Sequence, residues 1–158
     1  VSARKAFLLG ITHLSALGAG FAGGVYLLPI LIAPPSPSGI EAKNAASGAR
    51  YYAQFRRDLR GSDFLHWGEG TVAIGAKAVS FTGKLAPGPD YKLYFAHGLV
   101  ETGEDFLRVK ARARRAGDVK TFDNFIVPLP EGLDPAQFDT VVVWCETFSM
   151  FISAAKYR

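Results

Sequence analysis

Four side chains in this sequence have the chemistry to bind a metal ion or to transfer electrons. They are the single cysteine, Cys145, and the three histidines, His13, His66 and His97. A thiolate and an imidazole both bind metal ions and haem iron, and a thiol can also be oxidised reversibly. Cys145 is therefore the candidate redox residue, and the histidines are candidate cofactor-binding residues.

The spacing of these residues matches no common metal or haem motif. The sequence contains no H-x-x-x-H, C-x-x-C or C-x-x-C-H pattern, and one cysteine allows neither an intrachain disulfide nor a multi-cysteine zinc site. We therefore expect no metal and no cofactor, with haem as the alternative. G-x-S-x-G and Walker patterns are absent as well, so catalysis is not predicted. A net charge of +4 without a reading motif argues against nucleic acid as a partner.

The residues around Cys145 favour a structural role for it. The segment Thr140–Cys145 is almost wholly apolar, which is typical of a strand buried on both faces. A reactive thiol is instead partly exposed, in an electropositive setting that lowers its pKa. We expect a core cysteine, and the alternatives are a redox or haem thiolate and a cysteine that bonds lipid or another chain.

The element that determines where this chemistry takes place is the N-terminal segment. Residues 6–33 carry no fixed charge, and as a helix they would extend about 42 Å, longer than the ~30 Å hydrocarbon core of a bilayer. Arg4 and Lys5 precede this run, and no basic residue follows it before Lys43. By the positive-inside rule, residues 1–33 are predicted to be a single-pass anchor of the inner (cytoplasmic) membrane, with the N-terminus cytoplasmic and the C-terminal domain periplasmic. A cleaved signal peptide is the alternative, although its apolar region is usually about 7 to 15 residues.

Small residues recur along this predicted membrane helix. They would let a second transmembrane helix approach closely, so membrane lipid and other transmembrane helices are the predicted partners. His13, within the same run, could ligate haem or a chlorin, or could bond a neighbouring carbonyl group or water. The small-residue seam consists of Ser15, Ala16, Ala19, Gly20, Gly23 and Gly24.

Beyond the anchor, the sequence predicts a linker and one β domain. Residues 34–60 begin with a proline-rich stretch that ends the helix, and the aromatic spacing in 40–60 suggests an amphipathic helix on the membrane or on the domain. Residues 61–158 alternate with period two between turn-forming segments, which predicts an antiparallel β-sandwich or barrel-like, mainly β domain. The predicted strands are 65–74, 78–82, 91–96, 106–112, 122–128, 140–146 and 148–155.

One of these predicted strands carries a basic ladder. Strict alternation in 108–114 would place its basic side chains on one face, available to anionic lipid or to an acidic partner. Facing water or protecting a sheet edge is the alternative. The ladder consists of Arg108, Lys110, Arg112 and Arg114.

Several short motifs resemble the DM13 domain family. They are Tyr91-Lys-Leu-Tyr-Phe, Gly117-Asp118, Phe125-Ile-Val-Pro128 and Val141-Val-Val-Trp-Cys-Glu-Thr-Phe148 followed by Phe151. The resemblance extends over about residues 61–157. It implies an extracytoplasmic β domain, in a family found at times beside the haem-binding DOMON domain. It also implies a redox role for the family's cysteine, which is Cys145 here.

Three functions are compatible with this sequence. The favoured one is a non-catalytic accessory subunit of a larger membrane complex, with a bioenergetic complex as one candidate, because this function uses the seam and the basic ladder. The alternative is an electron-transfer module that uses Cys145 or a bound haem. The third is a sensor or adhesion module that binds a ligand outside the cytoplasm.

Overall fold

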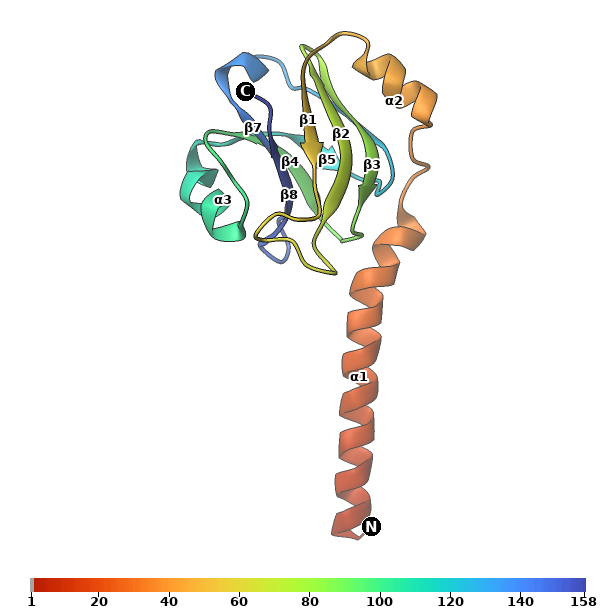
Figure 1. Cartoon of the computed structure of the whole chain (residues 1–158). Helices are drawn as coiled ribbons and strands as arrows, with labels where there is room; N and C mark the ends of the chain where they lie inside the picture. Colours follow the sequence, from red (N-terminus) through yellow and green to blue (C-terminus); the bar gives the residue numbers. More distant parts are fainter. Residues whose placement is uncertain (1) are drawn as a thin grey trace.

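The structure, a computed structural model that describes residues 2–158, is a β-sandwich on a long N-terminal helix (Figure 1). Two four-stranded antiparallel sheets form the sandwich. In the first sheet the strand order is β1-β2-β3-β6, and in the second it is β5-β4-β7-β8. The predicted sandwich and its preceding apolar helix are thus both confirmed. The strands are β1 (Ala49–Phe55), β2 (Gly68–Gly75), β3 (Ala78–Leu85), β4 (Tyr91–Ala96), β5 (Arg114–Val119), β6 (Phe125–Pro128), β7 (Thr140–Cys145) and β8 (Met150–Lys156).

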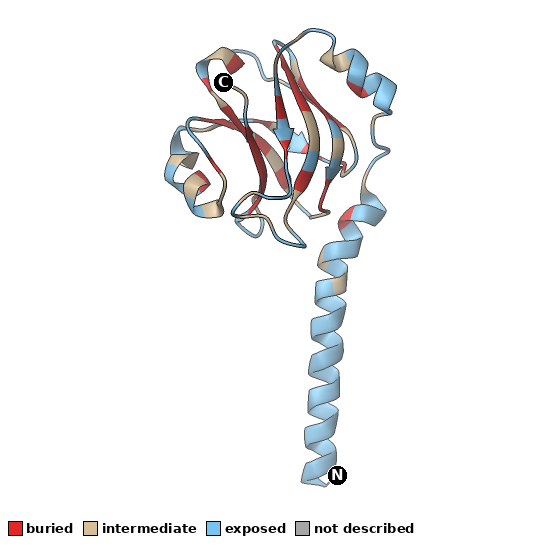
Figure 2. Ribbon diagram, in the orientation of Figure 1, coloured by how far each residue is buried: buried red, intermediate tan, exposed pale blue. Residues whose placement is uncertain are grey.

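The main core lies between the two sheets, where Figure 2 shows buried residues along the strands. Alternate residues of β7 contribute to it, because successive side chains of a strand point to opposite faces. Val141, Val143 and Cys145 are part of this core, together with Phe81 and Leu93 from strands of the two sheets. All six residues of β7 are buried, as the apolar run predicted.

A second, smaller core covers the other face of β7. Trp144 lies there with no exposed surface, with its ring centroid 5.0 Å from that of Phe106. Phe106 belongs to α3 (Gly103–Val109), whose first turn is capped by the Thr102 hydroxyl accepting from the Asp105 N–H at 3.1 Å. This short helix therefore closes the outer face of the second sheet. The 3₁₀ helices η1 (Lys110–Arg112) and η2 (Pro135–Gln137) lie in the connections that follow.

The long helix α1 (Ala3–Ile32) extends away from the sandwich, and Figure 2 shows it exposed along most of its length. Among residues 2–158 it is the one helix long and apolar enough to cross a membrane. Its only buried residue is Pro29, near the end adjoining the sandwich. Such a helix is apolar where a soluble protein would be polar, which is expected of an anchor or a signal sequence.

Residues 40–60 do not form the single amphipathic helix predicted for them. The structure has a short helix, α2 (Gly39–Ala46), followed by strand β1. A capping box fixes the start of α2, since Ser38 and Glu41 each accept a hydrogen bond from the other's backbone N–H. Ser80 on β3 donates to the Ala42 carbonyl at 2.6 Å, which holds α2 against the first sheet. The aromatic residues of the segment lie on β1. Their spacing would suit a helix, but pairing with β2 places them in a strand.

The predicted strand 106–112, with its basic ladder on one face, is also wrong. Its residues form α3 and η1 instead, and strand β5 begins only at Arg114. The Thr102 cap and the acidic residues Glu104 and Asp105 in the first turn stabilise the helix end, and burial of Phe106 holds it on the sheet.

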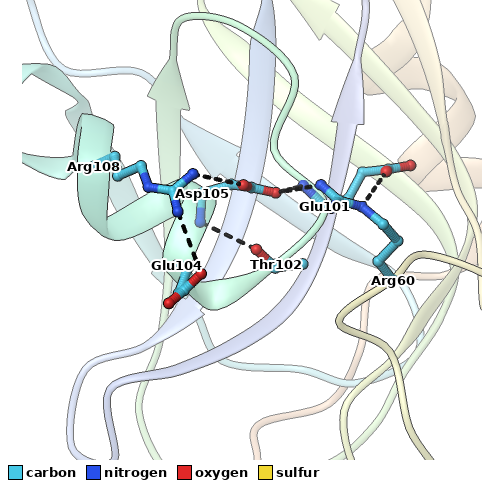
Figure 3. Close-up of polar contacts among 6 residues, drawn as sticks. All are labelled: Arg60, Glu101, Thr102, Glu104, Asp105 and Arg108. Carbon is cyan, nitrogen blue, oxygen red and sulfur yellow. Dashed lines mark hydrogen bonds and ion pairs between the residues drawn. The ribbon is translucent and has the colours of Figure 1, made fainter.

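Arg108, Lys110, Arg112 and Arg114 therefore do not share a strand face. In Figure 3, Arg108 lies 3.3 Å from Glu104 and 3.6 Å from Asp105, and Asp105 also pairs with Arg60 at 2.9 Å. Arg60 joins the loop after β1 to the start of α3, with Glu101 as its second partner at 2.9 Å. Lys110 pairs with the half-buried Glu146 at 2.6 Å. Two of the four basic residues are thus engaged within the domain.

Candidate functional site

An apolar pocket lies between α1 and the sandwich, and we refer to it as the α1–sandwich pocket. Its volume is about 590 Å³, within the range of small-molecule sites. One wall is formed by residues 21–26 of α1, and the other is formed by the β1–β2 loop, the β3–β4 loop and the β7–β8 hairpin. The lining residues are Phe21, Ala22, Val25, Tyr26, Leu65, His66, Pro87, Gly88, Pro89, Tyr91, Cys145, Phe148, Met150 and Ile152.

Cys145, the last residue of β7, lines this pocket. Only 2% of its surface is exposed, so it belongs to the main core as well as to the pocket wall. Burial raises the pKa of the thiol, and hydrogen bonds with the backbone at Phe148 and Asp90 offset only part of that rise. The thiol is therefore protonated and poorly nucleophilic at neutral pH, as expected of a core cysteine.

Tyr91 pairs with Cys145 across the strands β4 and β7 and also lines the pocket. Its hydroxyl donates to the Ala86 carbonyl at 2.9 Å, so its proton is engaged. Burial raises the pKa of Tyr91, and the neighbouring Cys145 sulfur raises it further. The Cys145 thiol and the adjacent Tyr91 hydroxyl are thus both protonated and uncharged at neutral pH.

His66 lines the same pocket from the loop between β1 and β2. Its Nδ1 lies 2.9 Å from a carboxylate oxygen of Asp63, and the backbone N–H groups of Leu65 and His66 also donate to that carboxylate. Burial raises the pKa of Asp63, but the hydrogen bonds from His66 and Leu65 outweigh it, and the net pKa is below its usual value. The ring of His66 is therefore fixed in orientation, with Nε2 on the side opposite Asp63.

The structure brings together two of the four residues selected for their chemistry. His66 and Cys145 line one pocket, whereas His97 is exposed and stacks on Phe138, with ring centroids 5.0 Å apart. His13 is far along α1, where its Nδ1 lies 2.7 Å from the Leu9 carbonyl oxygen, as the carbonyl alternative predicted. Within residues 2–158, no three His, Cys, Asp or Glu side chains are placed to share a metal ion.

The sequence reasoning did not identify Tyr91 and the α1 residues Phe21, Val25 and Tyr26 as part of a site. One signal was present for Tyr26: tyrosine is enriched where a membrane helix leaves the hydrocarbon core. Tyr91 belongs to a motif that was noted only for the family resemblance. The other residues have the composition of ordinary membrane or core positions, and only the position of α1 next to the sandwich brings them into one pocket with His66 and Cys145.

We expect the Cys145 thiol of the folded chain to resist modification. The full chain in detergent should react with a thiol reagent such as DTNB at a rate set by unfolding, because the sulfur is buried and its pKa is raised. The same chain in denaturant is the control and should react at once. Stoichiometric labelling of the folded chain within minutes would show that the thiol is accessible.

The raised thiol pKa also gives the stability of the domain a pH dependence. The folded state holds the Cys145 proton more tightly than the unfolded state, so this contribution is complete below the unfolded pKa of about 8.5. It is lost as pH rises through the folded pKa. Above pH ~8.5 the denaturant midpoint of unfolding should therefore fall. The midpoint of the Cys145→Ala variant should fall less steeply with pH than that of the unmodified chain.

Comparison with known protein families identifies the sandwich. The family model described as "Electron transfer DM13" matches residues 59–157, which include strands β2 to β8 and the histidine and cysteine of the pocket. The same comparisons find no matching curated protein and no matching solved structure. Because the family match covers more than half of the chain, this protein belongs to the DM13 family.

Proposed function

We propose that this chain is a non-catalytic accessory subunit that α1 anchors in a membrane, with its DM13 domain on the outer surface. The observation that carries the proposal is the uncovered apolar surface of α1, where Leu14 and Leu17 are each 70% exposed. Exposing that surface to water would be costly, whereas lipid solvates it. Arg4 and Lys5 at the far end favour a cytoplasmic N-terminus.

The end of the sandwich nearest α1 supports this placement. Phe64 is 86% exposed on the β1–β2 loop, and Phe148 is 44% exposed on the β7–β8 hairpin. Leu65 and Met150 beside them are also exposed and line the α1–sandwich pocket. Aromatic and aliphatic side chains at this end would enter the outer interface of the bilayer. The domain would then rest on the membrane instead of standing clear of it.

The small-residue seam supplies the contact to a larger complex. At about 100° per residue, Ala19 and Gly23 lie about 80° to 160° around α1 from Val25 and Pro29, which line pockets beside the sandwich. A Cβ added at Gly20, Gly23 or Gly24 would meet nothing within 4 Å. The seam glycines thus have room for another helix, and Gly20 and Gly24 also line a groove with Pro89 and Phe148 of the sandwich.

We expect the double variant Gly20→Leu with Gly24→Leu to lose its association with the partner protein. Two leucines would keep a second helix from the close approach that glycines allow, and recovery of the partner should fall about tenfold or more. The measurement is native mass spectrometry after gentle solubilisation. The matched control, Gly10→Leu with Gly18→Leu, alters glycines of α1 off the seam, which also have open surroundings, and should leave recovery unchanged. An unmodified chain that emerges alone, or equal recovery in both variants, would contradict the accessory role.

Electron transfer is the second candidate function, and the position of Cys145 in a pocket wall beside His66 favours it. The family's description points the same way. Haem fits these residues poorly, because a thiolate ligand needs a deprotonated, accessible sulfur, whereas Cys145 is buried with a raised pKa. A visible spectrum of the purified chain with and without dithionite tests it. A Soret band that shifts on reduction would favour electron transfer by a bound haem. A colourless chain would exclude a bound haem.

A further inference from the structure

The α1–sandwich pocket adjoins a second pocket that contains charged side chains, and we refer to the second one as the charged cleft. Its volume is about 260 Å³, and it shares Gly88, Pro89 and Tyr91 with the α1–sandwich pocket. The two are therefore neighbouring parts of one continuous depression. Residues 21–26 of α1 line the apolar part, whereas Pro29 and Ile32, at the end of α1 next to the sandwich in Figure 1, line the charged part.

The apolar part and the charged part lie at the depths of lipid tails and lipid headgroups. About 20 residues of helix cross a hydrocarbon core of ~30 Å, so a span that starts after Lys5 ends near Val25. The α1–sandwich pocket is then at the outer end of the hydrocarbon. At 1.5 Å per residue, Pro29 and Ile32 are roughly 6 and 10 Å farther out, which places the charged cleft among the headgroups.

The charged cleft presents groups of both signs. Asp90, Lys92, Asp118 and Lys120 line it, and Lys92 lies 2.6 Å from Asp90 and 3.1 Å from Oδ1 of Asp118. Arg115 contacts the same Oδ1 of Asp118 at 2.5 Å, which leaves Oδ2 to receive a further cation. Lys120 is exposed and forms no ion pair within residues 2–158. The cleft thus offers one ammonium group and one carboxylate oxygen to a ligand.

We propose that the two pockets together bind one phosphatidylethanolamine molecule of the bilayer. Its acyl chain lies in the α1–sandwich pocket, its phosphate pairs with the Lys120 ammonium, and its own ammonium pairs with Oδ2 of Asp118. This inference rests on the proposed function, because it takes α1 to be in lipid. A fatty acid or a phosphatidylglycerol has no cation for Asp118, and the quaternary ammonium of phosphatidylcholine has no N–H to donate. A primary-ammonium zwitterion matches both charges.

The test uses the full chain in nanodiscs made from equal parts of palmitoyl-oleoyl phosphatidylethanolamine, phosphatidylcholine and phosphatidylglycerol, with palmitic acid added. Native mass spectrometry identifies and counts the lipid that stays on the chain when the nanodisc is dissociated. We expect one phosphatidylethanolamine per chain, in about fivefold excess over each of the other three lipids, which is the effect of one additional exposed charge pair.

Four variants assign the retained lipid to the two pockets. Lys120→Gln should lower the retention of phosphatidylethanolamine about fivefold, and Ala22→Phe should lower it further by filling the apolar part from exposed α1. Asp118→Asn should remove the preference for phosphatidylethanolamine over phosphatidylcholine. The matched control is Lys156→Gln, which alters an exposed lysine at the opposite end of β8 from the pocket residue Met150 and should retain lipid like the unmodified chain.

Three results would overturn the assignment: no retained lipid, preferential retention of any of the other three lipids, or equal retention of phosphatidylethanolamine in Lys120→Gln and Lys156→Gln. Lys120 and Ala22 lie outside the strands, so their variants keep the test valid if Asp118→Asn disturbs the sheet. Failure of the anchor itself would appear separately, as a chain that does not enter nanodiscs.

Discussion

Replacing Leu14 and Leu17 with arginine should prevent the chain from residing in the membrane. Both side chains are 70% exposed near the middle of α1. Insertion scales assign about 2.5 to 3.5 kcal/mol to arginine at a helix centre and about −0.5 kcal/mol to leucine, so the pair should cost roughly 6 to 8 kcal/mol. That is enough to abolish stable insertion. Alkaline carbonate extraction of isolated membranes measures it, as the fraction of chain that stays in the pellet.

The matched control for this pair is Leu14→Ala with Leu17→Ala, which changes the same positions without adding charge. We expect the alanine variant to stay in the pellet, because the rest of α1 is still long and apolar enough to span. If the arginine variant is retained as fully as the alanine variant, α1 does not lie across the hydrocarbon core, and the exposed apolar surface must be covered by protein.

Trp144→Ala should destabilise the DM13 domain by about 3 to 5 kcal/mol, the range for truncating a large aromatic in a core. Trp144 has no exposed surface, and its ring packs between β7 and α3, with Phe106 on one side and the Lys110 amine 5.2 Å from the ring centroid. Removing the indole would leave a cavity under α3 and loosen the attachment of that helix. Denaturant unfolding followed by circular dichroism measures the loss.

The second tryptophan supplies the control. Trp67 is half-buried, and the Arg57 guanidinium lies 3.3 Å from its ring centroid at the surface. A cation–π contact at such a site is worth about 0.5 to 1 kcal/mol, so Trp67→Ala should cost far less than Trp144→Ala. Trp144→Phe should lose less than Trp144→Ala because it leaves most of the space filled. Equal losses for the two alanine variants would contradict the second core that α3 closes.

The parts of the fold with strong local signals could be predicted from the sequence. Strand β4 has the predicted bounds, Tyr91–Ala96, and β7 differs from its prediction by one residue, because both are apolar runs bounded by turn residues. The uncharged N-terminal run became α1 as predicted. In these segments the local sequence preference and the tertiary contacts favour the same secondary structure.

The failures lie where a local pattern met a stronger constraint. Alternation in 106–112 suggested a strand, but the Thr102 cap and the burial of Phe106 against Trp144 produce α3. Aromatic spacing in 51–59 suggested a helix, but pairing with β2 draws 49–55 into a sheet. Both constraints depend on partners distant in the chain, which a window of a dozen residues does not contain.

The candidate site was predictable only in part. Cys145 and His66 were selected by residue type, and the burial of Cys145 was expected from its strand. Their meeting in one pocket depends on the β1–β2 loop, the β3–β4 loop and the β7–β8 hairpin, and on the position of α1 next to them. No spacing in the sequence encodes that arrangement, and the aspartate that orients His66 was not selected at all.

In the proposed function, α1 stays attached and in lipid and holds the DM13 domain at the membrane surface. The most direct test is to wash membranes containing the chain with alkaline carbonate and to measure the intact mass of what remains. We predict that the chain stays in the membrane pellet and that its mass includes residues 6–33. A chain found in the aqueous fraction, with the mass of a polypeptide that begins after Ala33, would contradict this prediction and identify α1 as a cleaved signal sequence.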